Sequence, residues 1–447
     1  MFRILTFIML LLSINLSAQQ ASVYTFSLEE AVNFAKSNNY TLKNAELDEL
    51  AAKKKVNEIT AMGLPQISAS GNIINNTQIP VQVLPNFLKP VLGSGPDFIE
   101  AAFGNTYTSN ITLSVNQLLF DGTFFLGLKA SKEFVNLSRL SKTRTRIETE
   151  VNVAKAYYMV LLLESNQIMM QSNLDALSKS KNDLEQLYKS GFAEKIDVER
   201  ISLQLSNLSI QKEKIEDQTR AARMILKMQM GVKPADSIVL SSKLGELTTK
   251  TAATVVEESS NYTNRVEYKL LQQQLKLNQL DRKRYLVGYA PSIYAFGSHQ
   301  NNAFAGEGKF SELYNRFYPG TTIGLSVNLP IFDGLRKHAQ TQQASISISK
   351  TENDMKFFEN VIDQQIFTAK TDFNRAKKQL VVQQSNFRLA EDIYNTAQLK
   401  YKNGVGSSLE LTVAQTDLEN ARANMLATSF ELFVAELELK KALGQIN

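Results

Sequence analysis

LSVNQLLFDG, at residues Leu113–Gly122, returns as LSVNLPIFDG at residues Leu325–Gly334. The second copy starts 212 residues after the first, and seven of its ten residues are identical. A later motif repeats at nearly the same offset: the YKSG of Tyr188–Gly191 returns 213 residues later as the YKNG of Tyr401–Gly404. Self-similarity at a fixed offset indicates a duplicated structural unit. Each unit reads as strand, sharp turn, long helix, tight turn and second long helix.

The helices are predicted from apolar residues that recur at alternating steps of three and four. In the second half these positions are Ile366, Ala369, Phe373, Ala376, Leu380, Gln383, Phe387, Ala390, Tyr394, Ala397 and Tyr401, then Leu411, Ala414, Leu418, Ala421, Met425, Thr428, Leu432, Ala435, Leu439 and Ala442. A 3.5-residue repeat of this length is typical of a left-handed coiled coil. The first half repeats it more loosely. We therefore predict long helices at about 123–190, 195–230, 335–402 and 407–443. Taken alone, these heptads favour a filamentous or adaptor coiled coil.

The strands are predicted from strict alternation of apolar and polar residues, which places one face of each strand against an apolar environment. It runs through 111–116 and 323–330, and a partner strand follows Pro65 or Pro291 in each half. Proline ends the incoming helix because it lacks the hydrogen-bond donor. We predict β-hairpins at about 66–120 and 292–332, with connecting loops at 77–107 and 301–320. The strands alone suit either a membrane β-barrel or a small soluble sheet packed on the helices.

Composition and the N-terminal segment favour the membrane interpretation. Residues 1–18 have the charge, short apolar run and small-residue end of a signal peptide. No later run is long and apolar enough for a transmembrane helix. The formal net charge of +5 is spread along the chain, so nucleic-acid binding is not expected. With no cysteine and only His299 and His338, we expect no enzyme activity, no cofactor and no metal site.

The number of strands then requires more than one copy of the chain. Transmembrane barrels have at least about eight strands, and an open edge in lipid leaves backbone groups unpaired. Two copies would supply eight strands and three would supply twelve, and the count alone does not choose between them. Aromatic residues at the expected strand ends suit the membrane–water interface. They are Tyr107, Phe120, Phe317, Tyr318 and Phe332.

The chain resembles the TolC-like outer-membrane efflux proteins over nearly its whole length. The resemblance is carried by the duplicated order of three features. They are the F-D-G turns (Phe120-Asp121-Gly122 and Phe332-Asp333-Gly334), the helix-to-strand prolines, and the Tyr-x-x-Gly motifs (Tyr188–Gly191 and Tyr401–Gly404) at the tips where two long helices join. It implies a mainly α fold with a β membrane part: two tandem repeats, at about 19–240 and 263–447, flank an equatorial insertion at 231–262.

The resemblance also implies an assembly and a function. The expected assembly is a homotrimer, in which a 12-stranded barrel in the outer membrane continues into an α-helical tunnel in the periplasm. The expected function is that of a passive exit duct of a tripartite efflux pump or a type I secretion system, for small molecules or proteins. Its partners would be a periplasmic adaptor protein and an inner-membrane pump. The alternative is a periplasmic coiled-coil adaptor or structural protein.

Two groups of residues have expected structural roles. In each F-D-G turn, the aromatic residue would end the strand, the aspartate would cap the next helix and the glycine would permit the sharp bend. Gly191 and Gly404 suit left-handed helix ends. The resemblance implies that these tips form the periplasmic entrance and contact the adaptor, although an ordinary helical turn explains them equally well.

The resemblance implies further residues at the closed entrance. Asp197 and Tyr401 lie where a link between an acid and a tyrosine is expected to join neighbouring helical hairpins. The basic partner expected near Gly406 is missing. Glu410 matches an acidic entrance position, whereas a second acidic position falls at Val413. Asp417 is seven residues after Glu410, on the same heptad face, so three copies would form rings of carboxylates that favour cations. A solvated coiled-coil face is an equally good interpretation of Asp417.

Overall fold

The computed structural model describes residues 22–87, 91, 93–242 and 262–446. The expected signal peptide and most of the expected insertion lie outside these residues. The chain divides into two compact units. The sheet unit comprises residues 50–136 and 273–352, and the tip unit comprises residues 1–49, 137–272 and 353–447. The exact limits of the two repeats and of the insertion stay predictions.

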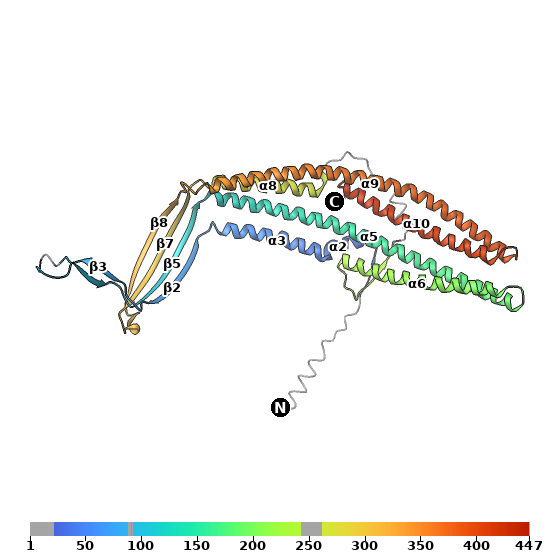
Figure 1. Ribbon diagram of the computed structural model, residues 1–447, viewed down its shortest axis with the longest axis horizontal. Helices are drawn as coiled ribbons and strands as arrows, with labels where there is room; N and C mark the ends of the chain where they lie inside the picture. Colours follow the sequence, from blue (N-terminus) through green and yellow to red (C-terminus); the bar gives the residue numbers. More distant parts are fainter. Residues whose placement is uncertain (1–21, 88–90, 92, 243–261, 447) are drawn as a thin grey trace, which may run out of the picture. The chain divides into compact units, whose positions relative to one another are not determined.

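The sheet unit contains an antiparallel four-stranded sheet in the order β2-β5-β7-β8 (Figure 1). The strands are β2 (Gln66–Asn75), β5 (Tyr107–Phe120), β7 (Ser292–Ala305) and β8 (Phe317–Asn328). The two predicted hairpins are confirmed as the β2–β5 and β7–β8 pairs. Pairing of β5 with β7 joins the two halves of the chain in one sheet.

The register of this sheet gives it one apolar and one polar face. Ile67 pairs with Val115, and Gly297 pairs with Ile323, so these positions share the apolar face. Five residues along, a row of polar side chains crosses all four strands on the opposite face. This row consists of Asn72, Asn110, Asn302 and Tyr318. The apolar and polar residues that alternate along the sequence therefore lie on opposite faces of the sheet.

Both predicted connecting loops differ from the structure. The first contains two further strands, β3 (Val81–Pro85) and β4 (Phe98–Ala102), which pair as a separate antiparallel hairpin. The second is shorter than predicted, because β7 continues to Ala305 and β8 already begins at Phe317. Ala303 and Ala305 are buried there against Leu313, so tertiary packing extends the strands beyond the alternating pattern.

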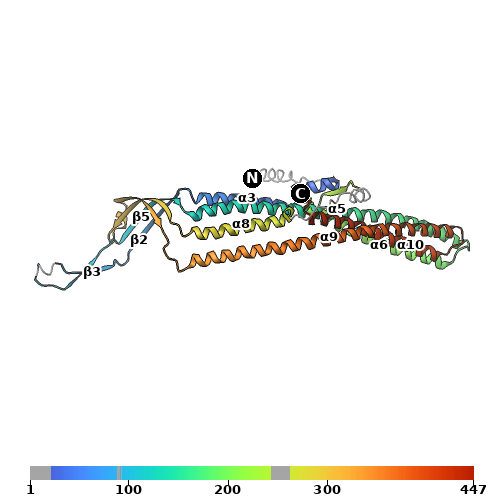
Figure 2. The same ribbon diagram turned by 90° about the horizontal axis from the view of Figure 1, so that it is seen from above.

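The four long helices form two antiparallel pairs. They are α5 (Gly122–Lys189) with α6 (Lys195–Met230), and α9 (Arg336–Lys402) with α10 (Ser408–Ala442), and Figures 1 and 2 show each pair running to a tight turn. The shorter helices are α2 (Leu28–Asn38), α3 (Tyr40–Ala61) and α8 (Val266–Val287). Throughout the described ranges, no helix is both long and apolar enough to cross a membrane.

The predicted heptad positions supply the cores of these pairs. Between α5 and α6 the buried residues are Met170, Leu177, Leu184, Ile201, Leu208 and Ile215. Between α9 and α10 a smaller cluster contains Ala376, Leu380, Leu432 and Ala435. Alanine at alternate positions lets the helices approach closely, because its side chain ends at Cβ.

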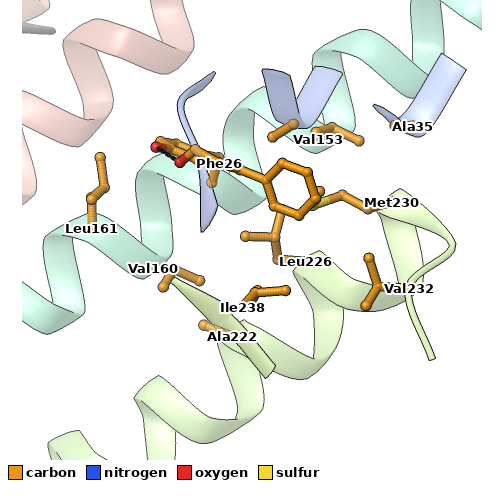
Figure 3. Close-up of a cluster of buried hydrophobic side chains, with 12 residues drawn as sticks. Phe26, Ala35, Val153, Val160, Leu161, Ala222, Leu226, Met230, Val232 and Ile238 are labelled. Carbon is orange, nitrogen blue, oxygen red and sulfur yellow. Dashed lines mark hydrogen bonds between the residues drawn. The ribbon is translucent and has the colours of Figure 1, made fainter. Parts of the chain in front are cut away.

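A third cluster lies where α5 and α6 meet a parallel pair of short strands, β1 (Val23–Phe26) and β6 (Ser237–Leu240). Figure 3 shows side chains from both helices and both strands meeting in it. The hydroxyl of Tyr157 in α5 donates to the carbonyl oxygen of Phe26 at 2.8 Å, so a buried polar group is satisfied within the cluster. This strand pair was not predicted from the sequence.

Candidate functional site

The tight turns that join α5 to α6 and α9 to α10, here called the tips, have the same backbone geometry. Gly191 and Gly404 adopt left-handed φ angles of 81° and 73°. The N–H of Phe192 donates to the carbonyl of Leu187 at 2.8 Å, and the N–H of Val405 donates to that of Lys400 at 3.0 Å. This is the Schellman ending, in which glycine avoids the steric penalty of a left-handed residue. The duplicated sequence thus produces a duplicated turn.

Each tip also exposes an apolar side chain that sequence reasoning missed. Phe192 is 82% exposed and Val405 is 78% exposed, and each directly follows its tip glycine. The signal was present in the sequence, because both copies of the turn carry an apolar residue at this position. Burying such side chains against a partner is favourable because it removes apolar surface from water.

The structure brings Asp197 and Tyr401 to one cavity of about 580 Å³ between the two tips. The side chain of Asp197 accepts a hydrogen bond from the hydroxyl of Ser408, not from Tyr401. Tyr401 instead packs against the α5–α6 core. Burial, with a smaller contribution from the nearby Asp197 charge, raises the pKa of Tyr401. The expected acid–tyrosine link is therefore replaced by an acid–serine bond with the tyrosine packed beside it.

Basic side chains lie at the tips even though position 406 is glycine. Arg200 and Lys402 line the same cavity as Asp197. The N–H of Gly406 donates to the carbonyl of Lys400 at 3.2 Å, and a β-carbon at position 406 would come within 3.0 Å of the Lys400 β-carbon. Close packing of the turn therefore accounts for glycine at this position.

Glu410 lines a groove of about 600 Å³ on the α9–α10 pair, together with Asp417 and Asp392. Its backbone N–H donates to the Ser407 hydroxyl at 3.1 Å, which caps α10. Its carboxylate forms an ion pair with Lys400 at 3.1 Å. The acid predicted at the entrance is thus partly balanced by a lysine that sequence reasoning missed.

The two F-D-G turns, both in the sheet unit, differ in structure. In the first, Asp121 accepts hydrogen bonds from the N–H groups of Thr123 at 2.7 Å and Phe124 at 3.4 Å, so it caps α5. Phe120 is the last residue of β5, as predicted. Gly122 does not have a positive φ. A β-carbon there would lie 2.1 Å from Cγ1 of Val287, so glycine is required by close packing and not by a bend.

In the second turn, the prediction for Phe332 is wrong, because β8 ends at Asn328 and Phe332 lies beyond it. Pro330 cannot donate a ladder hydrogen bond, which accounts for the early end of the strand. Gly334 and Leu335 both adopt positive φ angles, of 67° and 65°, before α9 begins at Arg336. Asp333 accepts a hydrogen bond from the N–H of Lys337 at 3.2 Å. Only this copy bends at the glycine.

The outer membrane efflux protein family model matches residues 31–232 and 286–445, which include both tips and both long helix pairs. The chain belongs to this family. It is 19% identical over 447 residues to the outer membrane protein TolC of Vibrio cholerae, covering 98% of this chain and 95% of that protein. Over 124 residues, 26% of this chain and 24% of the relative, it is 31% identical to the probable efflux pump outer membrane protein TtgC of Pseudomonas putida.

Solved channels have the same fold. CusC superposes with a TM-score of 0.70 at 16% identity, covering 93% of this chain and 92% of CusC. VceC of Vibrio cholerae gives a TM-score of 0.67 at 16% identity, covering 93% of this chain and 96% of VceC. The chain is therefore an outer-membrane transport protein of TolC-like fold with a periplasmic helical body, and the alternative of a periplasmic adaptor is not supported.

Proposed function

We propose that this protein is the passive outer-membrane exit duct of a tripartite efflux pump or a type I secretion system, and that it works as a homotrimer. The observation that carries the proposal is the open sheet of the sheet unit. Among the described strands, β2 and β8 each pair on one side only. In lipid, the unpaired backbone groups of these two edges need partners.

The strand directions allow copies of the chain to provide those partners. Each copy supplies four antiparallel strands, so β2 and β8 run in opposite directions. Pairing β8 of one copy with β2 of the next therefore continues the antiparallel order. Three copies give twelve strands, an even number within the range of outer-membrane barrels.

The tips of the tip unit would form the periplasmic entrance of this duct. Gly191 and Gly404 fix the turns, and Phe192 and Val405 present apolar side chains that would pack on a periplasmic adaptor. The adaptor would in turn connect the duct to an energised inner-membrane pump. Some TolC-like relatives, such as TtgC, are described as parts of efflux pumps.

Electron microscopy of the native particle extracted from outer membranes tests the assembly. We expect a threefold particle with a barrel about 40 Å tall and a tunnel of roughly 100 Å, the length of a 68-residue helix at ~1.5 Å per residue. A monomer or dimer without a barrel would overturn the proposal.

Changing the two tip side chains tests the adaptor contact. We expect the double variant Phe192→Asp, Val405→Asp to lose most of the export of an efflux substrate from intact cells, because two exposed apolar contacts become charged. The matched control is Lys195→Glu with Glu199→Lys, which exchanges an exposed ion pair near the same tip. The double variant should still assemble trimers. Unchanged export by these trimers would argue against docking through the tips.

Glu410 and Lys400 provide a test of the entrance. If three copies of Glu410 line it, Glu410→Gln should reduce block of the channel by divalent cations. Lys400→Gln should increase that block, because the carboxylate loses the ion pair at 3.1 Å. Single-channel current measured with and without a divalent cation tests both changes. Unchanged block in Glu410→Gln would exclude Glu410 from the conducting path.

A further inference from the structure

Within the tip unit, α10 contacts the α5–α6 pair at three successive levels. At the tip, the hydroxyl of Ser408 donates to Asp197 of α6. Eleven residues further along α10, the carboxylate of Glu419 accepts a hydrogen bond from the amide of Asn173 in α5. Eleven residues are about three helical turns, so Ser408 and Glu419 lie on one face of α10, roughly 16 Å apart.

The third level combines an aromatic stack with the ion pair of Lys155 in α5 and Glu438 in α10. The rings of Phe433 in α10 and Tyr158 in α5 stack with centroids 4.2 Å apart and planes 14° from parallel. Tyr158 is fully buried, and burial raises its pKa to about 12. Separating these rings would expose their apolar surface to water, a cost that hydration of the Tyr158 hydroxyl, buried without a hydrogen-bond partner among the described residues, offsets only in part. Separating the two polar contacts would instead exchange protein hydrogen bonds for bonds to water, at a small net cost.

The Asn173–Glu419 contact is built more tightly than a surface hydrogen bond. The Glu419 side chain is 19% exposed, and Arg422, one turn further along α10, places its Nη1 atom 4.0 Å from the carboxylate. Arg422 is itself held over the ring of Phe387 in α9, at 5.3 Å from the centroid. Its Nε atom is buried and has no hydrogen-bond partner among the residues that the structure describes. Three helices thus meet at this carboxylate.

The electrostatics of the site agree with this geometry. Burial raises the pKa of Glu419, while Arg422 and the hydrogen bond from Asn173 act in the opposite direction. Tyr394 of α9 also faces the carboxylate, and its pKa is raised by its own burial and by the charge of Glu419. An added negative charge at position 173 would therefore meet a partly dehydrated carboxylate, where repulsion is strong.

We propose that the Asn173–Glu419 contact is a second latch, after the Asp197–Ser408 contact, between the α5–α6 pair and the α9–α10 pair of one copy. This contact must separate for the entrance to open, while the Tyr158–Phe433 stack stays closed. The latch rests on the proposed duct function. It assigns Asn173 and Glu419 to positioning the hairpins, and neither residue need touch the cargo. The duplicated tip motif does not include either residue.

Single-channel recording of the purified full-length protein in planar lipid bilayers tests the latch. Asn173→Asp sets two carboxylates against each other, and we expect open probability to rise roughly tenfold, the factor given by about 1.4 kcal/mol of repulsion. The matched control is Asn182→Asp, on an exposed position of the same helix. It adds the same charge nine residues further along α5 and should behave as wild type.

A role exchange then separates a direct contact from a general structural effect. In the double variant Asn173→Asp, Glu419→Gln, the amide lies on α10 and the carboxylate on α5, so the hydrogen bond forms with donor and acceptor exchanged. We expect its open probability to return to that of wild type. If Asn173→Asp does not assemble, Glu419→Ala removes the acceptor without adding charge and should also raise open probability.

The outcomes distinguish failure of the latch from failure of the duct. An open probability of Asn173→Asp equal to that of Asn182→Asp, in a preparation whose wild type conducts, would overturn the latch alone. So would a role exchange that leaves the channel as open as Asn173→Asp. If the wild type and every variant assemble but pass no current, both the latch and the proposed duct are wrong.

Discussion

Gly122→Ala is expected to lower the stability of the assembled protein strongly. The new β-carbon would lie 2.1 Å from Cγ1 of Val287, inside any allowed contact distance. Valine is branched at Cβ and holds few rotamers, so it cannot move aside cheaply. Overpacking of this kind costs about 1–3 kcal/mol, and here it acts where β5 passes into α5. The temperature at which the assembled oligomer dissociates measures the effect.

Removing the opposing methyl groups should rescue this variant. In Gly122→Ala with Val287→Ala, the new β-carbon would face Cβ of residue 287 at 3.5 Å, an ordinary contact. Gly334→Ala is the matched control in the second F-D-G copy. It strains a backbone with φ of 67°, but among the described residues no atom beyond its chain neighbours lies within 4 Å of the new β-carbon. A Gly334→Ala defect as large as that of Gly122→Ala, with no rescue, would contradict the packing explanation.

Gly231→Ala is expected to be at least as damaging. Gly231 ends α6 with φ of 75°, a conformation that disfavours alanine. The new β-carbon would also lie 2.2 Å from the carbonyl oxygen of Asn38, and a backbone atom cannot rotate away. Strain and overpacking together should cost about 2–4 kcal/mol. Thermal unfolding followed by circular dichroism, together with the yield of folded protein, measures it.

The repeat provides a graded control for this prediction. Gly444 occupies the corresponding place in the second half, with φ of 68° and a new β-carbon 3.1 Å from Asn264. Gly191 has φ of 81°, and within the described ranges no atom beyond its chain neighbours lies within 4 Å of an added β-carbon. The loss of stability on substitution by alanine should therefore decrease from Gly231 to Gly444 to Gly191. Equal losses at all three positions would show that backbone strain alone decides the effect.

Helices and strands with long periodic patterns were predictable from the sequence. The heptads between Ile366 and Ala442 and the alternation on both sides of Leu113 and Leu325 record which residues face an apolar environment. This information is local, because each pattern extends over many residues of one element. The duplication then supplied the order of the elements, and the two hairpins of the sheet followed from it.

Short pairings between distant segments were not predictable. Strands β1 and β6 have four residues each, and their partners are more than 200 residues apart in the chain. The hairpin formed by β3 and β4 lies inside a segment whose proline and glycine indicate a loop. Four or five residues carry too little periodicity to identify a strand, and only the pairing reveals it.

The candidate site shows the same division. The tip glycines could be located from the repeated Tyr-x-x-Gly, because a left-handed helix end is a local property of the backbone. The partner of Asp197 could not be located in this way, because Ser408 lies 211 residues away in the other pair of long helices. For the same reason the contact between Asn173 and Glu419, 246 residues apart, has no signature in the sequence.

The F-D-G turns show most directly what each source of information decided. The sequence by itself determined that the chain is duplicated, that each half pairs a hairpin with two long helices, and where the helices begin and end to within a few residues. Only the tertiary structure decided that one glycine is needed for packing against Val287 and the other for a left-handed backbone. Identical residues take different roles because the neighbours that surround them come from distant parts of the chain, and local sequence does not encode those neighbours.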